Sequence, residues 1–349
     1  MHAYAVAPAT GLLKMDAMEN PFTLPHDLQT KLGERLGALE LNRYPSGERQ
    51  RYLQTVLATH AGAPEGSATI LGNGSDELIS LTVMACAQPG AKVLAPLPGF
   101  VMYAMSAQLQ GLEFVGVPLT PDFELDEAAM LAAIAAHRPA VTFLAYPNNP
   151  TATLWSEAAV QRIVDAVGAQ GGIVVMDEAY QPFASRSWVA NMRAEPRRNA
   201  HVLLMRTLSK FGLAGVRLGY LIGPAALVNE IDKVRPPYNV SVLNCEAALF
   251  ALEYLDLFAA QAAALRAERE DLVARLRRMD GVRKVWPSEA NMVLIRVDNP
   301  HTVFDGMKQR GVLIKNVSTM HPLLAGCLRL TVGDSVANAQ MLAALQASL

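Results

Sequence analysis

The sequence has few cysteines, and their arrangement argues against two common frameworks. Its 349 residues contain only Cys86, Cys245 and Cys327, which are odd in number, far apart and in no C-x-x-C pair. This pattern indicates reduced thiols rather than a disulfide framework or a zinc site. The seven histidines form no H-x-x-x-H pair, so we expect no metal site.

An excess of charge of one sign is also lacking. Lysine and arginine number 30 against 32 acidic residues, and no basic run is present, which argues against a nucleic-acid partner. No apolar run reaches membrane-spanning length, so we expect no membrane partner. The opening "MHAYAVAPAT" lacks the basic and continuous apolar regions of a secretory signal. We therefore expect a cytoplasmic protein.

What the sequence does contain is enough apolar residues for a large core, because 51% of the chain is hydrophobic. Short apolar runs alternate with Ala-rich helical stretches such as 156–170, where Ser156 is a candidate N-cap. Strands are expected at 91–96, 112–119, 140–146, 172–178, 201–207 and 218–224. Strands buried on both faces and separated by helices predict an α/β fold with a mostly parallel sheet.

The C-terminal part of the chain predicts a second, smaller lobe. Residues 244–279 are predicted to form one long amphipathic helix between the lobes. Further strands are expected at 282–287, 291–297, 311–317 and 327–333. The proline-punctuated N-terminus shows few helical signals and is expected to wrap the smaller lobe. The predicted domains are residues 31–243, and a small domain made of residues 1–30 and 244–349.

Polar residues follow four of the expected strands. These segments are "PLPGF" (96–100), "YPNNP" (146–150), "DEAY" (177–180) and "TLSK" (207–210). In open α/β sheets, ligands bind beyond the carboxyl ends of the strands. We therefore expect these polar groups to meet at one edge of the sheet.

Lys210 and Asp177 are the two charged residues in these segments that need an explanation. Lys210 lies between an apolar strand and a Gly-rich turn, so it is either a paired structural cation or an amine kept for chemistry. Asp177 follows the apolar "GIVVM", where a lone buried charge is costly. Taken alone, Asp177 is more often a structural ion-pair partner, here of Lys210, than the partner of a ligand cation such as a protonated ring nitrogen.

The segment "GNGSDE" (72–77) precedes an apolar helix and allows two interpretations. Ser75 and Asp76 are common N-cap residues, so an ordinary capped helix is favoured on this motif alone. After the tight turn at Gly74, the helix N-terminus also offers free N–H groups to an anion. The endings of a P-loop and of a G-x-G-x-x-G fingerprint are both absent, which disfavours a nucleotide-binding protein.

Several other side chains, each considered alone, could have either a ligand-binding or a structural role. Arg217 could bind a phosphate as a bidentate donor, with Ser209 adding a hydroxyl, or both could be loop residues. Asn149 could hold a turn, while Tyr180 and Phe100 could be packed aromatics. Together they match a ligand with a protonatable aromatic ring, a phenolic oxygen, a phosphate, and an aldehyde for a lysine amine. That ligand is pyridoxal 5′-phosphate.

Seven motifs spread over nearly the whole chain carry a family resemblance. They are "KMDAMENPF" (14–22), "LNRYP" (41–45), "GNGSDELI" (72–79), "PNNPT" (147–151), "DEAY" (177–180), "RTLSKFGLAGVRLGY" (206–220) and "GCLRLTVG" (326–333). They resemble the fold-type I pyridoxal-phosphate-dependent aminotransferases, and within them the histidinol-phosphate aminotransferases. The resemblance implies a large domain with a seven-stranded, mostly parallel sheet flanked by helices, plus a smaller α+β domain.

The resemblance also implies a role for each residue at the cofactor. Lys210 would hold the cofactor as a Schiff base and move the proton, and Asp177 would pair with the ring nitrogen. Tyr180 and Asn149 would hydrogen-bond the phenolic oxygen, and Phe100 would stack on the ring. The expected catalytic residues are Lys210, Asp177 and Tyr180. The expected phosphate-site residues are Gly74, Ser75, Asp76, Thr207, Ser209 and Arg217.

For the substrate, the resemblance implies that Arg329 binds the anionic end and that Tyr4 contributes to the same group. Asn149 and Tyr44 are further expected substrate-binding residues. Tyr44 would also reach the cofactor phosphate from a second subunit, which implies a homodimer with shared active sites.

The implied reaction is transamination of L-histidinol phosphate with 2-oxoglutarate, which gives imidazole-acetol phosphate and glutamate in histidine biosynthesis. An aromatic amino-acid aminotransferase or a phosphothreonine decarboxylase would carry the same cofactor residues. A non-catalytic aminotransferase-like sensor is disfavoured, because the chain shows no helix-turn-helix segment and no basic extension.

Three positions depart from the family pattern. The loop from Lys210 to Arg217 is one residue shorter than in many relatives, which puts the placement of Arg217 in question. Ala152 stands where the family has glycine, and Phe100 lacks the hydroxyl of the usual tyrosine. The last two departures are expected to leave the chemistry intact.

Overall fold

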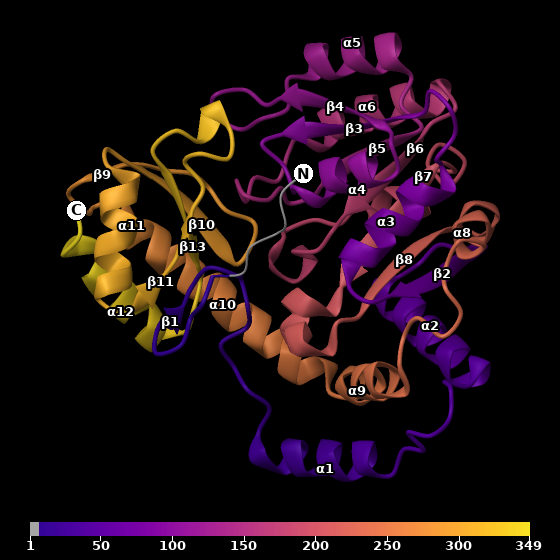
Figure 1. The fold of residues 1–349 in the computed structure, drawn as a ribbon, viewed down its shortest axis with the longest axis horizontal. Helices are drawn as coiled ribbons and strands as arrows, with labels where there is room; N and C mark the ends of the chain where they lie inside the picture. The colour runs from indigo at the N-terminus through magenta and orange to yellow at the C-terminus, as the bar shows by residue number, and fades with distance from the viewer. Residues whose placement is uncertain (1–6) are drawn as a thin grey trace.

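The computed structural model describes residues 7–349, in which a seven-stranded sheet forms the centre of the larger lobe (Figure 1). The strand order is β2-β8-β7-β6-β5-β3-β4. The strands are β2 (Ser67–Gly72), β3 (Lys92–Leu97), β4 (Glu113–Pro118), β5 (Val141–Ala145), β6 (Ile173–Asp177), β7 (Val202–Thr207) and β8 (Gly219–Pro224). Strands β3 to β7 run parallel, whereas β8 is antiparallel to both β7 and β2. The predicted mostly parallel sheet is confirmed.

The six strands expected for this sheet are all present, but β2 has no counterpart among them. Its sequence "SATILG" carries only a short apolar run and leads directly into a Gly-rich turn. Because β2 is an edge strand, only its last three residues are buried. The short apolar signal therefore reflects its position at the edge.

Helices cover both faces of the large sheet. One face packs against α2 (Gly47–Ala61), α5 (Glu127–His137), α6 (Glu157–Ala169), α7 (Val189–Ala194) and α9 (Val242–Leu252). The other packs against α3 (Ser75–Ala85), α4 (Met102–Leu109) and α8 (Ala225–Asp232). Along β6, Val174 and Met176 face the first set of helices and Val175 faces the second. This alternation explains why the central strands are apolar on both faces.

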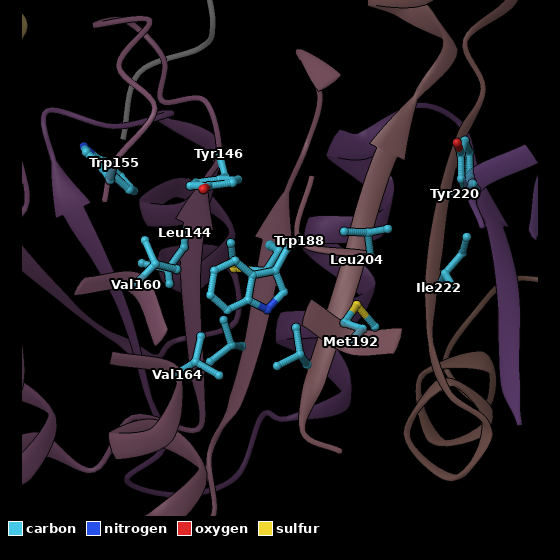
Figure 2. Close-up of a cluster of buried hydrophobic side chains, with 14 of the residues drawn as sticks. Leu144, Tyr146, Trp155, Val160, Val164, Trp188, Met192, Leu204, Tyr220 and Ile222 are labelled. Carbon is cyan, nitrogen blue, oxygen red and sulfur yellow. The ribbon is translucent and has the colours of Figure 1, made fainter. Parts of the chain in front are cut away.

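Figure 2 shows part of the first core, where the side chains of β5, β7 and β8 meet those of α6 and α7. Trp188 is fully buried, and the ring of Tyr146 meets it edge-on at 6.0 Å between centroids. The indole N–H of the equally buried Trp155 donates to the Phe123 carbonyl oxygen at 2.9 Å. Large aromatic rings with satisfied polar atoms contribute strongly to such a core.

The smaller lobe contains an antiparallel sheet of order β12-β13-β10-β9. Its strands are β9 (Val282–Val285), β10 (Met292–Val297), β12 (Lys315–Asn316) and β13 (Cys327–Thr331), and its helices are α10 (Leu255–Leu276), α11 (Pro300–Gln309) and α12 (Ser335–Gln346). The N-terminal arm joins this lobe, because β1 (Leu13–Lys14) pairs in parallel with β11 (Val312–Leu313). The strand expected at 311–317 is therefore divided between two sheets.

The prediction of one continuous helix over 244–279 is wrong. Helices α9 and α10 meet at an angle of 78°. The physical reason is that they serve different cores: α9 is buried along most of its length against the large sheet, whereas α10 packs in the smaller lobe. Among residues 7–349 no single helix is long and apolar enough to span a membrane, and the bent pair α9–α10 meets those criteria only when taken together.

One helix begins where the sequence shows little sign of a helix. Helix α1 (His26–Gly37) begins inside the N-terminal stretch that shows few helical signals, and only its Leu28 is buried. In Figure 1 it projects from the body of the molecule. Its Arg35 forms ion pairs with Glu246 and with Glu253 at the end of α9. Ser156 does occupy the N-cap position of α6, as expected, but its side chain makes no capping hydrogen bond.

Candidate active site

The carboxyl ends of β3, β5, β6 and β7 open into a cavity of about 270 Å³. The smaller lobe closes one side of it through Arg329 of β13 and Lys315 of β12. The cavity is lined by most of the residues expected at the site, namely Ser75, Asp76, Phe100, Asn149, Asp177, Tyr180, Thr207, Ser209, Lys210, Arg217 and Arg329. The predicted convergence of four strand ends is therefore confirmed.

Lys210 is held just beyond β7, in one turn of π-helix over Ser209–Leu213. Its amine donates a hydrogen bond to the Ala17 carbonyl oxygen at 2.7 Å. Burial, together with the nearby Arg329 guanidinium, lowers the pKa of Lys210 to about 8. The turn depends on Gly212, whose φ is +137° and where a Cβ would lie 2.9 Å from Asn20 Nδ2. A short π-helical turn is often found at a functional site.

Asp177 ends β6 and is buried, with a residue exposure of 5%. Its Oδ2 accepts a hydrogen bond from the Tyr103 hydroxyl at 2.6 Å, and its Oδ1 accepts one from the Ala179 N–H at 3.0 Å. Burial raises the pKa of Asp177 to about 6, although these two hydrogen bonds act in the opposite direction. Each carboxylate oxygen keeps a further lone pair, so the group can still accept a proton donor from the cavity.

A structural ion pair between Asp177 and Lys210, the interpretation favoured from the sequence alone, is wrong. Among the described residues the Asp177 carboxylate is bonded to Tyr103 and Ala179, and the Lys210 amine turns instead to the backbone of Ala17. The reason is that the partners come from elements that the sequence does not place: a helix after β3 and the N-terminal arm. Both charged groups are thereby left directed at the cavity.

The N-terminus of α3 forms one wall of the cavity without a side-chain cap. Gly74, not Ser75 or Asp76, is the N-cap residue, and no side chain there makes a capping hydrogen bond. The ordinary capped-helix interpretation is therefore wrong. The first N–H groups of a helix have no partner within the helix, so an uncapped start is suited to an anion.

Arg217 lies against this helix start. Its Nη1 donates to Ser209 Oγ at 3.1 Å, and its Nη2 is 3.6 Å from Asp76 Oδ2. Thr207 Oγ1 also donates to Ser209 Oγ, at 3.0 Å. A Cβ on Gly74, whose φ is +78°, would lie only 2.6 Å from Arg217 Nη2. The shorter loop after Lys210 therefore does not remove Arg217 from the site, although Arg217 itself has a left-handed φ of +52°.

A second arginine in the cavity lining links the two lobes. Arg329 is buried, and its Nη1 donates to Asn149 Oδ1 at 2.7 Å while its Nη2 donates to the Asp16 carbonyl oxygen at 2.7 Å. Phe100 lines the cavity with its ring edge-on to Tyr103 at 5.7 Å. A buried guanidinium with a planar donor fork is suited to a carboxylate or phosphate.

The structure adds site residues that were not expected from the sequence. Tyr103 lies in the first turn of α4, three residues after Phe100, which precedes the helix, so no regular spacing in the sequence marks it as a site residue. Asp16 and Lys14 also line the cavity, and Asp16 Oδ1 is buried without a hydrogen-bond partner among residues 7–349, 3.6 Å from Lys14 Nζ. Ala17 contributes only a backbone oxygen, so no side-chain pattern could have indicated it.

Three expected residues do not line the described cavity. Gly74 is the N-cap residue of α3, directly before Ser75, but is not itself among the lining residues. Tyr44 is 77% exposed and stacks on Tyr238 at 4.4 Å, away from the cavity lining. Tyr4 lies outside the described residues. Ala152, which replaces the family glycine, is fully buried and has a left-handed φ of +60°, so the backbone there retains the conformation that favours glycine.

Comparison with known proteins decides the family. The sequence pattern described as aminotransferase class I and II matches residues 12–346. The chain belongs to this family. A histidinol-phosphate aminotransferase of Acidovorax sp. (strain JS42) is 76% identical to it over 349 residues, which cover all of this chain and 95% of that protein. The sheet, the site and the sequence thus agree on a class I and II aminotransferase.

Solved aminotransferase structures share the whole fold. The histidinol-phosphate aminotransferase from Clostridium acetobutylicum has a TM-score of 0.86 at 21% identity and covers 96% of this chain and 98% of its own. The enzyme from Sinorhizobium meliloti in complex with pyridoxal 5′-phosphate has a TM-score of 0.83 at 23% identity, over 99% and 94%. At these identities the likeness concerns the fold, which is fold-type I with a second, smaller lobe.

Proposed function

We propose that this aminotransferase uses pyridoxal 5′-phosphate to convert L-histidinol phosphate and 2-oxoglutarate to imidazole-acetol phosphate and glutamate. The observation that carries the proposal is the meeting of four groups in one cavity: a lysine amine, a buried carboxylate and two arginines, one from each lobe. The relative that is 76% identical over the whole chain carries the name of this activity.

The residues present fit the cofactor chemically. The buried carboxylate of Asp177 suits a protonated ring nitrogen, because a buried charge needs a partner of opposite sign. The uncapped start of α3, together with Ser209 and Arg217, suits the phosphate group. Phe100 offers a ring face to the same space, and Tyr180 and Asn149 line it beside Lys210. These residues would hold the cofactor with Lys210 bound to its aldehyde carbon.

Bound pyridoxal phosphate supplies an electron-withdrawing ring that stabilises negative charge at the substrate Cα. The chain supplies the base. Because the pKa of Lys210 is lowered to about 8, its neutral Nζ is available near neutral pH to take a proton from the substrate Cα and return one. Asp177 holds compensating negative charge in a buried environment, where electrostatic interactions are strong.

Arg329 gives the site its preference for anionic substrates. Its guanidinium is held by Asn149 and by the Asp16 carbonyl oxygen, which orients the fork before substrate arrives. A phosphate and a carboxylate both accept paired N–H donors, so one arginine serves both half-reactions. Lys14 and Lys315 line the same end of the cavity and add positive charge there.

The same chemistry fits two rival donors, so the deciding experiment is a donor panel. The purified holoenzyme is assayed with histidinol phosphate, phenylalanine and phosphothreonine, with 2-oxoglutarate as acceptor and with carbon dioxide release as a second readout. We expect kcat/KM to be highest for histidinol phosphate among the three donors. Turnover of phenylalanine or decarboxylation of phosphothreonine, with no turnover of histidinol phosphate, overturns it in favour of that activity.

We also propose a homodimer in which Tyr44 reaches the cofactor phosphate of the partner subunit. Three observations support it: α1 projects from the body, only its Leu28 is buried, and the large apolar side chains Leu41, Tyr44 and Tyr238 are exposed near it. Exposed apolar patches of this kind mark interaction surfaces. A cytoplasmic location, and the division of the chain into residues 31–243 and residues 1–30 with 244–349, also remain proposals.

Subunit mixing tests the shared site. A Tyr44→Ala chain and a Lys210→Ala chain, each inactive or nearly so alone, are unfolded together and refolded. A mixed dimer has one site with both native residues, so activity should reappear on mixing. A monomer by sedimentation, or no recovery from mixed dimers, contradicts the proposal.

A further inference from the structure

Tyr103 is a buried residue that contacts two residues expected to hold the cofactor ring, namely Asp177 and Phe100. It lies in the first turn of α4 with 2% of its surface exposed, and its hydroxyl donates to Asp177 Oδ2 at 2.6 Å. Its ring stacks on Phe143 with centroids 4.5 Å apart and planes within 8°, and meets Phe100 edge-on. The two aromatic neighbours fix the ring, so the hydroxyl is directed at the carboxylate.

This hydrogen bond has the character of one made to a charged acceptor. A phenol O–H at 2.6 Å from a carboxylate oxygen is short, and such charge-assisted bonds favour the ionised form of the acceptor. The Ala179 N–H occupies the other oxygen, so the two donors together fix the plane of the carboxylate. Asp177 can then present its remaining lone pairs in only one orientation.

Resting on the proposed cofactor, we propose that Tyr103 is a positioning residue, whose hydroxyl keeps the Asp177 carboxylate ionised and oriented toward the ring nitrogen. Tyr103 acts through Asp177 rather than on the reacting atoms. The aromatic ring of Tyr103 has a separate structural task, because it packs on Phe143 and supports Phe100. Hydroxyl and ring can therefore be tested apart.

The acidic groups around Asp177 favour its protonated form, and the Tyr103 hydroxyl opposes that effect. Asp177 is faced by Asp76 from α3 and by Glu178 next to it in the chain, and both raise its pKa, as burial does. Burial raises the pKa of Tyr103 well above its usual value, and the nearby Asp177, Asp76 and Tyr180 add to the rise. The Tyr103 hydroxyl therefore keeps its proton and remains a hydrogen-bond donor. Removing the hydroxyl takes away the largest influence that opposes a rise in the pKa of Asp177 above about 6.

The test is the pH dependence of cofactor binding in the Tyr103→Phe variant, which keeps the packed ring. The dissociation constant of pyridoxal 5′-phosphate is measured by equilibrium dialysis in a Lys210→Ala background. That background removes both the covalent bond and the titration of the lysine. Affinity requires ionised Asp177, so it is lost as pH falls through the pKa of that group. Between about pH 9 and about pH 5, the ratio of the variant's dissociation constant to that of its parent should grow by about tenfold for each unit of pKa shift.

Two control variants show whether the effect comes from the Tyr103 hydroxyl acting on Asp177. Tyr220→Phe removes another buried tyrosine hydroxyl, which interacts with Arg206 instead, and its ratio should not change with pH. In an Asp177→Asn background, Tyr103→Phe should also lose its pH-dependent effect, because the group that titrates is gone. Thermal melting of each variant shows that the chains remain folded.

The outcomes separate this inference from the proposed function. If the unsubstituted chain, with Lys210 intact, binds no pyridoxal 5′-phosphate at any pH, the proposed function fails. If the parent binds it and Tyr103→Phe changes the affinity equally at every pH, or not at all, Tyr103 is only a packing residue and the inference is overturned. A ratio that rises as pH falls, and is absent in both comparisons, supports it.

Discussion

The Lys210 amine donates a 2.7 Å hydrogen bond to the carbonyl oxygen of Ala17, which lies 193 positions earlier in the chain. Ala17 belongs to the N-terminal arm, whose next residue, Met18, is tied to the smaller lobe by Thr331 and Asn291. The lysine of the large sheet is thus held by an element fixed to the other lobe. A neutral carbonyl, rather than an acid, holds the amine, so the amine keeps the lowered pKa that its chemistry needs.

Lys210→Ala should abolish turnover, because it removes both the covalent anchor of the cofactor and the group that carries the Cα proton. Steady-state rates and the visible absorbance of the bound cofactor report the two losses separately. Lys233→Ala is the matched control, since Lys233 is exposed and pairs with Glu230 three positions earlier in the chain. Near-normal rates in the Lys210 variant would contradict the assigned role.

The amine of Lys210 should react at a lower pH than an ordinary lysine side chain in water. Only the neutral amine attacks an acylating reagent, and a pKa of about 8 means that half of Lys210 is neutral at that pH. Labelling of the cofactor-free chain with a small reagent, followed by mass spectrometry, should give a midpoint near pH 8 for Lys210, well below the ordinary lysine pKa of about 10.4. A midpoint at the ordinary lysine value would contradict the argument that burial activates this amine.

Much of the fold could be predicted because its signals are local. The apolar runs of the central strands and the polar residues that follow them are visible in the sequence, and strand ends in a parallel sheet lie at one edge. The features that the sequence did not predict are those that depend on contacts with residues far away in the chain. Helices α9 and α10 form one apolar stretch in sequence, but they bend by 78° because each is buried against a different core.

The site shows the same division. Residues in strand-end motifs, such as Asp177 and Lys210, could be recognised as candidates, but the partner of each could not. The sequence favoured pairing them with each other, whereas the structure pairs Asp177 with Tyr103 and Lys210 with a backbone oxygen. Contacts across 74 and 193 positions leave no periodic signal, and a backbone acceptor leaves none at all.

Gly74→Ala should weaken cofactor binding by displacing Arg217. The added Cβ would lie 2.6 Å from Arg217 Nη2, so the guanidinium must move away from the phosphate site. Loss of one charge-assisted hydrogen bond, ~1.5–3 kcal/mol, corresponds to about tenfold or more in affinity. The measurement is the dissociation constant of pyridoxal 5′-phosphate.

Gly171→Ala is the control for Gly74→Ala, because Gly171 also has a positive φ, +77° against +78°, but nothing within 4 Å of its added Cβ. Both variants should lose stability, by about 1–3 kcal/mol, because an L side chain rarely adopts a positive φ. Only Gly74→Ala should lose cofactor affinity. Equal affinities in the two variants would show that Arg217 does not need the space above Gly74.

Arg329→Lys should raise the KM for both histidinol phosphate and 2-oxoglutarate. The charge is kept, but the planar donor fork that Asn149 and Asp16 orient is lost. We expect an increase of about tenfold or more for each substrate, since hydrogen bonds to charged groups contribute ~1.5–3 kcal/mol. Arg283→Lys, at an exposed ion pair with Asp298, should leave both KM values unchanged. An effect on only one substrate would show that the two anions bind at different places.

Glu178→Gln should destabilise the fold far more than an equivalent change at the surface. Glu178 pairs with Arg206 in the core, with both side chains almost fully buried, and also accepts hydrogen bonds from Ser187. The amide leaves the Arg206 charge buried without a counter-charge, which typically costs about 3–5 kcal/mol. Glu230→Gln, at the exposed pair with Lys233, should cost at most about 1 kcal/mol. Urea unfolding of both cofactor-free variants measures the loss in the free energy of unfolding. Equal losses in the two variants would mean that the buried Glu178–Arg206 pair does not stabilise the contact between β6 and β7.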